Sequence, residues 1–176
     1  MRRLRYNVAM SLDGYIADAH DGFDWILNDD TVDFAALFAR VDTIILGRRT
    51  YDVVRAQAEK PWKPGTRVFV VSRTLAPESH DGVTIVSGDP VAVASSLRRE
   101  SGDGEIWLFG GGQLFAELLA GNQVDAVEVT VMPVLLGAGV KVLAPTPGRS
   151  ALTLTHSHVY PSGMVALHYS VPGAAP

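Results

Sequence analysis

Three consecutive glycines, Gly110, Gly111 and Gly112, follow an apolar run and precede a stretch whose apolar residues have helical spacing. A phosphate group needs unobstructed backbone N–H donors, and glycine provides them because it has no side chain. A helix that begins at this point adds oriented N–H groups and the positive end of its dipole. The run therefore indicates an anion-binding turn, with a tight strand-to-helix turn that binds nothing as the alternative. Its spacing differs from the Gly-x-Gly-x-x-Gly fingerprint of Rossmann proteins.

Two arginines lie at a second junction of the same type. Gly47, Arg48, Arg49 and Thr50 follow the apolar run at residues 43–46, and Thr50 is a candidate helix N-cap. Guanidinium groups suit bidentate contact with phosphate oxygens, so the pair indicates a phosphate site. A solvated basic turn is the alternative.

A third strand candidate, at residues 67–72, ends in Ser72 and is followed by Arg73. It again places a hydroxyl and a guanidinium at the end of a strand. Ligands of open α/β sheets bind beyond the carboxyl ends of the strands. Three such ends with phosphate-binding chemistry point to one extended anion, and a dinucleotide with an extra 2′-phosphate fits them best.

The segment at residues 18–30 combines five aspartates with Gly22 and Trp25. It follows a turn at Asp13 and Gly14. An acidic loop with an apolar residue inside it could close over a site as a mobile lid. A solvated loop that Trp25 pins to the protein is the alternative.

The composition narrows the class of protein. The chain has 176 residues, of which 47% are hydrophobic, so one domain over residues 1–176 with a sizeable core is expected. The net charge of -4 argues against a nucleic-acid partner. The chain lacks cysteine, which excludes disulfides and thiolate metal sites, and no apolar segment is long enough to cross a bilayer. A cytoplasmic protein without a membrane partner is expected.

Short apolar runs alternate with helical patterns, which is typical of an α/β domain. The expected strands cover residues 4–11, 43–46, 67–72, 83–86, 105–109, 124–133, 152–160 and 164–171. The expected helices cover residues 31–40, 50–58, 90–101 and 112–120. The early strands are apolar on both faces, as in a parallel sheet under helices, whereas the last two alternate in polarity, as in an antiparallel hairpin. The sheet is therefore expected to be mixed, parallel first and antiparallel at its C-terminal end.

Three motifs, in this order, resemble those of dihydrofolate reductases. They are VAMSLDGYIA at residues 8–17, LGRRTY at residues 46–51 and FGGGQLF at residues 109–115. The chain resembles still more closely the C-terminal reductase domain of the riboflavin-biosynthesis bifunctional deaminase–reductase and its stand-alone relatives. The resemblance implies a dihydrofolate-reductase-like three-layer α/β fold, with a mixed, mainly parallel sheet flanked by helices. It also implies NADPH as the hydride donor and a homodimer, for which the C-terminal hairpin offers an apolar strand edge.

The resemblance further implies roles for individual residues around NADPH. The backbone of Ala9 and Ile16 would meet the nicotinamide carboxamide. The residues that would hold the phosphates and the adenine side are Gly47, Arg48, Arg49, Thr50, Ser72, Arg73, Gly110, Gly111, Gly112, Gln113 and Leu114. A cis peptide bond is implied between Gly110 and Gly111.

The substrate side departs from the known patterns. Tyr15 stands where riboflavin-pathway reductases usually carry a lysine. Asp30 and Asp33 lie near the helix that carries the substrate-binding acid of dihydrofolate reductases, and Asp13 could orient a heterocycle or relay a proton. The further candidates for contact with the substrate are Met10, Trp25, Phe34 and Leu37.

The expected reaction is hydride transfer from NADPH to a C=N or C=O carbon of a small pyrimidine- or pteridine-like heterocycle. It would resemble the reduction of 5-amino-6-(5-phosphoribosylamino)uracil in riboflavin biosynthesis. Three alternatives stay open, namely a true dihydrofolate reductase, an NADP-binding protein without catalysis, and a scaffold whose glycine turn binds nothing. His156 and His158 share one face of an expected strand, but no third ligand accompanies them, so no metal is expected.

Overall fold

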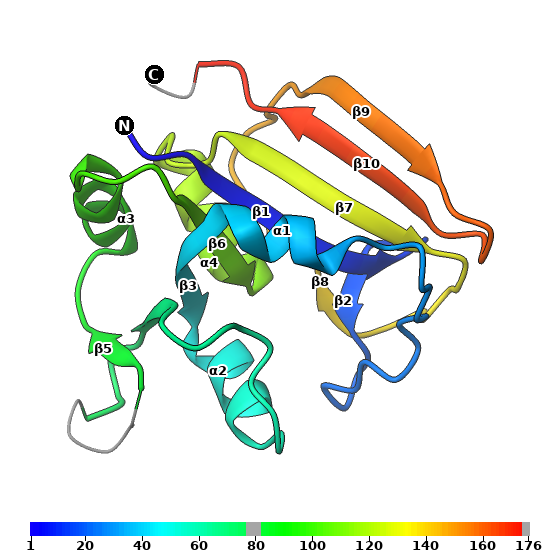
Figure 1. The fold of residues 1–176 in the computed structure, drawn as a ribbon, viewed down its shortest axis with the longest axis horizontal. Helices are drawn as coiled ribbons and strands as arrows, with labels where there is room; N and C mark the ends of the chain where they lie inside the picture. Colours follow the sequence, from blue (N-terminus) through cyan, green and yellow to red (C-terminus); the bar gives the residue numbers. More distant parts are fainter. Residues whose placement is uncertain (77–81, 174–176) are drawn as a thin grey trace.

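An eight-stranded sheet forms the centre of the computed structural model, which describes residues 1–76 and 82–173. The strand order is β5-β4-β3-β6-β1-β7-β10-β9 (Figure 1). The strands are β1 Leu4–Ser11, β3 Val41–Gly47, β4 Arg67–Val71, β5 Thr84–Val86, β6 Glu105–Gly110, β7 Ala126–Met132, β9 Thr153–Val159 and β10 Val165–Ser170. The pairings from β5 across to β7 are parallel, whereas β10 is antiparallel to both β7 and β9. The predicted mixed sheet with an antiparallel C-terminal hairpin is confirmed.

Helices cover both faces of this sheet. They are α1 Phe34–Arg40, α2 Arg48–Arg55, α3 Pro90–Arg99 and α4 Gly112–Ala120. On one face, Tyr6 and Leu108 pack with α3 and α4, and the Tyr6 ring stacks on Phe115 with centroids 3.9 Å apart. On the other face, Ile44 and Trp107 pack with residues of α1 and α2, and α1 crosses in front of the sheet in Figure 1. Burial on both faces explains why the parallel strands are apolar nearly throughout.

Helix α1 begins three residues later than its apolar pattern predicts. Asp33 caps the helix, and its carboxylate accepts a hydrogen bond from the backbone N–H of Ala36 at 2.8 Å. Thr31 lies outside the helix, in a turn where its backbone N–H donates to the Asp29 carboxylate at 3.0 Å. A short acidic side chain accepts hydrogen bonds from the free N–H groups of a first helical turn. The helix therefore begins after Asp33, although the apolar periodicity extends to earlier residues.

Helix α2 begins two residues earlier than predicted. Its N-cap is Gly47, and Arg48 is the first helical residue. Thr50 therefore lies inside the first turn, and the prediction that Thr50 is the N-cap is wrong. The Thr50 hydroxyl packs instead against the glycine turn described below.

Two short strands escaped the sequence analysis. β2 Tyr15–Ala17 pairs in antiparallel fashion with β8 Val140–Lys141 and forms a separate two-stranded sheet. Strands of two or three residues show no periodicity, so their apolar residues alone do not reveal them. The longest helix of the described residues, α3, has 10 residues, and no helix in those parts of the chain could reach across a bilayer.

Candidate functional site

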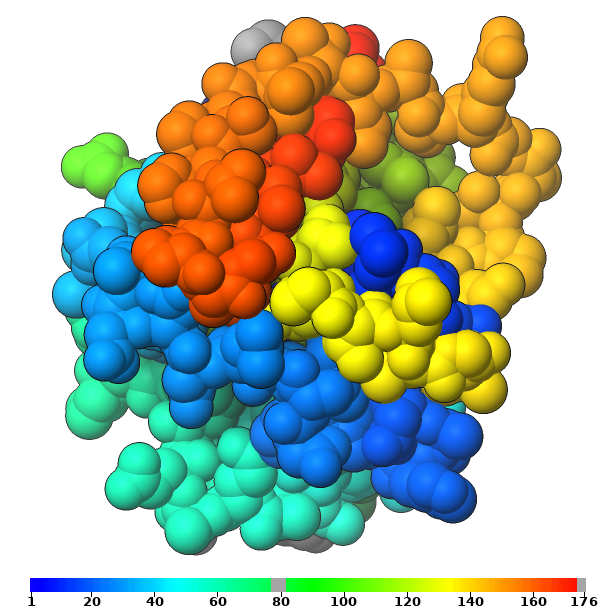
Figure 2. Space-filling model, turned by 90° about the vertical axis from the view of Figure 1, so that its right-hand side faces the viewer, coloured from blue at the N-terminus to red at the C-terminus, as the bar shows by residue number. Residues whose placement is uncertain are grey.

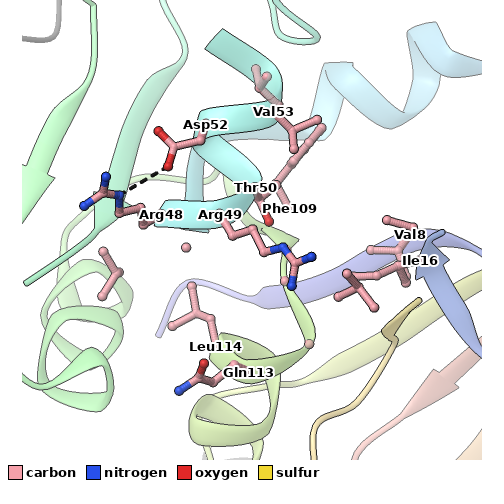
Figure 3. Close-up of a pocket in the computed structure, with 18 of the residues that line it drawn as sticks. Val8, Ile16, Arg48, Arg49, Thr50, Asp52, Val53, Phe109, Gln113 and Leu114 are labelled. Carbon is pink, nitrogen blue, oxygen red and sulfur yellow. Dashed lines mark hydrogen bonds and ion pairs between the residues drawn. The ribbon is translucent and has the colours of Figure 1, made fainter. Parts of the chain in front are cut away.

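A cleft of about 950 Å³ opens at the carboxyl ends of β3, β4 and β6, between α1, α2 and α4 (Figure 3). It gathers every residue that the sequence analysis assigned to the cofactor, namely Ala9, Ile16, Gly47, Arg48, Arg49, Thr50, Ser72, Arg73, Gly110, Gly111, Gly112, Gln113 and Leu114. The parallel order of β4, β3 and β6 explains this, because parallel strands bring their carboxyl ends to one edge of the sheet.

The glycine turn connects β6 to α4 along the cleft. Gly110 has φ +142°, and the peptide bond between Gly110 and Gly111 is cis, as the resemblance implied. A Cβ added at Gly110 or Gly111 would lie 3.2 or 3.3 Å from the Thr50 hydroxyl oxygen. A Cβ added at Gly112 would lie only 2.2 Å from the carbonyl oxygen of Lys141 in β8. The glycines are therefore required by close packing, in addition to leaving the backbone open to a ligand.

Two helices begin at this cleft without a side-chain cap. Within the described residues, neither Gly47 at the start of α2 nor Gly111 at the start of α4 makes a capping hydrogen bond through a side chain. The first N–H groups of both helices thus lack the partner that Ser, Thr, Asp or Asn supplies at most helix starts. Uncapped N–H groups and two positive dipole ends at one cleft favour an anionic ligand with more than one phosphate.

Two of the three arginines that line the cleft have acidic partners. Arg48 pairs with Asp52 at 3.2 Å and also donates to the Thr74 hydroxyl, whereas Arg49 pairs with Asp21 at 2.6 Å. The two arginine side chains extend from the start of α2 in different directions (Figure 3). The Arg49–Asp21 pair links the acidic segment at residues 18–30 to α2 across the mouth of the cleft. Both pairs are partly exposed, so a phosphate can compete for the guanidinium groups.

Asp13 is held away from the cleft by three neighbours. Its carboxylate accepts hydrogen bonds from the Ser11 hydroxyl at 2.6 Å and from the backbone N–H groups of Gly137 and Leu136, at 2.7 and 3.1 Å. The hydrogen bond from Ser11, followed by those from the backbone, lowers the pKa of Asp13 to about 2. Asp13 thus braces the turn after β1 against the loop after β7 and does not line the cleft, contrary to its predicted placement beside the substrate.

The other two acids proposed for catalysis do not line the cleft either. Asp33 caps α1, and Asp30 is exposed in the loop before it. The structure therefore corrects the placement of Asp30 and Asp33 as well. Both lie at or before the N-terminal end of α1, whereas the cleft is lined by one lateral face of this helix. In the part of the chain that the structure describes, no three acidic or histidine side chains gather as a metal site would require.

The four candidates for substrate contact divide into two pairs. Phe34 and Leu37 line the cleft from α1. Met10 does not, since it packs against the core under α3 and α4. Trp25 does not line it either, since its indole N–H donates to the carbonyl of Gly22 at 3.1 Å and ties the acidic segment together. Because this contact lies within the segment, it does not test whether Trp25 pins the segment to the rest of the protein.

Several residues that line the cleft had no role in the sequence analysis. They are aromatic or aliphatic, and the main ones are Phe23, Ile26, Phe38, Val53, Trp107 and Phe109. The spacing of Phe34, Leu37 and Phe38 along one helix face could have identified Phe38. Strand alternation alone could not identify Trp107, because both faces of β6 are apolar.

The sequence as a whole matches a known family. The model of the RibD C-terminal domain matches residues 2–166. The chain belongs to the RibD C-terminal domain family. A similar solved structure is that of a candidate riboflavin biosynthesis protein from Shewanella sp. PV-4, with 30% identity and a TM-score of 0.83. The match covers 96% of this RibD C-terminal domain protein and 98% of the Shewanella chain. The resemblance to this family is confirmed.

Two more distant structures share the fold of this RibD C-terminal domain. One is a diaminohydroxyphosphoribosylaminopyrimidine deaminase/5-amino-6-(5-phosphoribosylamino)uracil reductase from Thermotoga maritima, with 15% identity over 97% of this chain and 56% of that one, and a TM-score of 0.71. The other is a dihydrofolate reductase from Enterococcus faecalis in complex with NADP(H), with 16% identity, coverage of 97% and 96%, and a TM-score of 0.70. Both are reductases, and the predicted dihydrofolate-reductase-like fold is confirmed.

Proposed function

We propose that the protein is a cytoplasmic NADPH-dependent reductase that transfers hydride to a C=N or C=O carbon of a pyrimidine- or pteridine-like heterocycle. The observation that carries the proposal is a cleft that has helix starts and arginines at one end and aromatic side chains at the other. The phosphate-binding end has two uncapped helix starts and three arginines, Arg48, Arg49 and Arg73. The reductases among the structural relatives support it, one of which was solved with NADP(H).

The residues present suit such a cofactor. When bound, NADPH would supply the hydride. The N–H groups at the starts of α2 and α4 and the arginines would bind its phosphates, and the backbone of Ala9 and Ile16 would orient the nicotinamide. Trp107 and Phe109 would exclude water from the two rings. Of the acids that line the cleft, Asp21 and Asp52 are paired with Arg49 and Arg48, so we expect a proton taken up by the product to come from water.

The assay for this proposal follows NADPH absorbance while reducible heterocycles are added one at a time, with dihydrofolate in the set. Oxidation that depends on both the enzyme and one heterocycle would support the proposal, and turnover of dihydrofolate alone would identify a dihydrofolate reductase. The pairing of Asp21 and Asp52 with arginines favours one competing function, an NADP-binding protein without catalysis. Bound NADPH that no heterocycle oxidises would favour that alternative.

Removal of the Asp21 charge is expected to tighten NADPH binding. Asp21 pairs with Arg49 at 2.6 Å, so its carboxylate competes with a cofactor phosphate. The Asp21→Asn variant should lower the Kd for NADPH roughly two- to fivefold, the range of an exposed ion pair, in a fluorescence titration. Asparagine tolerates the φ of 64° at this position, so the loop should keep its shape.

The matched control for this variant is Asp24→Asn, which removes the same charge from an exposed position of the same loop that does not line the cleft. The control is expected to bind NADPH as the parent does. Equal gains in the two variants, or no gain in Asp21→Asn, would show that Asp21 does not compete for Arg49.

We also propose that the protein forms a homodimer through its C-terminal hairpin. All seven residues of β9 are exposed, and Leu154 and Val159 are 52% and 70% exposed. The β9–β10 hairpin, orange to red in Figure 2, lies uncovered at the surface on that side. A long exposed edge strand with apolar side chains is a site for association. Light scattering should give the mass of two chains, and a mass near 18.9 kDa would refute the dimer.

A further inference from the structure

One face of α1 forms an apolar wall at the end of the cleft away from the arginines. Phe34, Leu37 and Phe38 are spaced as neighbours on one helix face, and all three line the cleft. Phe34 is 54% exposed, and Phe23, which also lines the cleft, is 43% exposed. Large aromatic side chains at the mouth of a cleft remain in water unless a ligand with an apolar surface covers them.

The floor of this end is also apolar. Phe38 and Trp107 have ring centroids 5.7 Å apart, and Trp107 and Phe109 have centroids 4.8 Å apart. The indole N–H of Trp107 already donates to the backbone carbonyl of Asn7 at 2.9 Å. The Asn7 side chain is also engaged, because its amide donates to Glu128 at 2.9 Å. The floor therefore presents ring faces, while its polar groups point into the protein.

The cations that line the cleft lie at its other end, where Arg48 and Arg49 are at the start of α2 and Arg73 follows β4. The other charged residues that line it, Asp21, Asp52 and Glu117, are acidic and would repel an anion. The ammonium of Lys63 lies 5.9 Å from the centroid of the Phe38 ring, but Lys63 is exposed and does not line the cleft. Gln57, which follows α2, lines the cleft and carries an uncharged amide.

A ligand anion at this end would lose water without gaining a cationic partner, which is strongly unfavourable. We infer that the apolar end of the cleft selects a flat, uncharged ring system that carries neither a phosphate nor a carboxylate, with Gln57 as its polar contact. The inference rests on the proposed function, since it concerns the substrate of the same cleft. It separates this protein from reductases whose substrate carries a phosphoribosyl group.

The test uses two probes that differ by one charge, quinoxaline, a neutral planar compound with C=N bonds, and quinoxaline-2-carboxylate. Calorimetric titration of each probe is carried out on the protein alone and on the protein saturated with NADP⁺. Quinoxaline is expected to bind at least about tenfold more tightly, since each factor of ten corresponds to about 1.4 kcal/mol. Equal binding, tighter binding of the carboxylate, or no binding of either probe would overturn the inference. If the titration with NADP⁺ gives no binding heat, that result counts against the proposed cofactor. The preference between the two probes is then still measured on the protein without NADP⁺.

A cation introduced at the apolar wall provides the second measurement. Phe34→Arg is expected to raise the affinity for quinoxaline-2-carboxylate relative to quinoxaline by about tenfold or more, and the exposure of Phe34 means that no core contact is lost. Ala36→Arg adds the same charge to an exposed position of α1 that does not line the cleft, and should leave the ratio unchanged. An equal shift in both variants, or none in either, would overturn the inference. Phe23→Arg, also at the mouth, is the second variant should Phe34→Arg fail to fold.

Discussion

Gly112→Ala is expected to lower the free energy of unfolding by about 3 kcal/mol, the upper range for a side chain forced into a filled space. A Cβ at position 112 would lie 2.2 Å from the carbonyl oxygen of Lys141 and 3.1 Å from that of Val142. Both atoms belong to the backbone, so neither can rotate away. The backbone carbonyl of Gly112 also accepts a hydrogen bond from the N–H of Ala144 at 3.1 Å, and a shift of α4 would strain it. Urea denaturation followed by circular dichroism would measure the loss.

Gly47→Ala is the control, since Gly47 is another glycine that lines the cleft at a strand-to-helix junction, as the N-cap of α2. Its φ of -81° is accessible to alanine, and the atoms nearest to an added Cβ are 3.8 Å away. The control should unfold within about 0.5 kcal/mol of the parent, as for a substitution without a clash. A Gly112→Ala variant as stable as the control would show that α4 and β8 are not in close contact.

Glu128→Gln is expected to lower the free energy of unfolding by about 3 kcal/mol, because it leaves a buried guanidinium without its main partner. Arg5 is 0% exposed, and its Nη1 donates to the two carboxylate oxygens of Glu128 at 2.7 and 2.8 Å. Glu105 lies 2.5 Å from the other terminal nitrogen and would remain. Glu128 also accepts from Asn7, whose backbone carbonyl holds the Trp107 indole at the floor of the cleft. Thermal and urea unfolding would both report the change.

The double variant Arg5→Met with Glu128→Leu removes both charges but keeps side chains of similar volume. It therefore tests how much of the effect is due to the unpaired buried charge. Replacement of both partners of a buried ion pair by apolar residues is often neutral, but Glu105 loses its contact with Arg5 in the double variant, so only part of the lost stability should be regained. A double variant less stable than Glu128→Gln, or a Glu128→Gln variant as stable as the parent, would show that the buried charge of Arg5 is compensated by other groups.

Most of the fold follows from hydrophobic patterns of ordinary length. The runs at residues 43–46 and 105–109 are apolar on both faces, which is what a parallel strand under two helix layers requires. The alternation in the last two strands likewise indicated the hairpin formed by β9 and β10. Besides the missed strands β2 and β8, two errors lie at helix starts, where Asp33 and Gly47 set the boundaries through capping and backbone conformation rather than through periodicity.

The phosphate end of the cleft was predictable and the substrate end was only partly so. Gly47 and Gly110 are the last residues of parallel strands and Ser72 follows another, so the parallel topology brings all three to one edge of the sheet. The acids Asp13 and Asp33 were misplaced because short polar side chains readily bind nearby backbone N–H groups in turns and caps. Such local hydrogen bonds depend on the path of the loops, which the sequence pattern does not reveal.

The most direct test of the NADPH site is a fluorescence titration of the unmodified protein with NADPH and, separately, with NADH. The two cofactors differ by the 2′-phosphate that Arg48, Arg49 and Arg73 are proposed to bind. We expect NADPH to bind at least about tenfold more tightly, the equivalent of one charge-assisted contact of about 1.4 kcal/mol. Equal affinities for NADPH and NADH, or no binding of either, would contradict the proposed site.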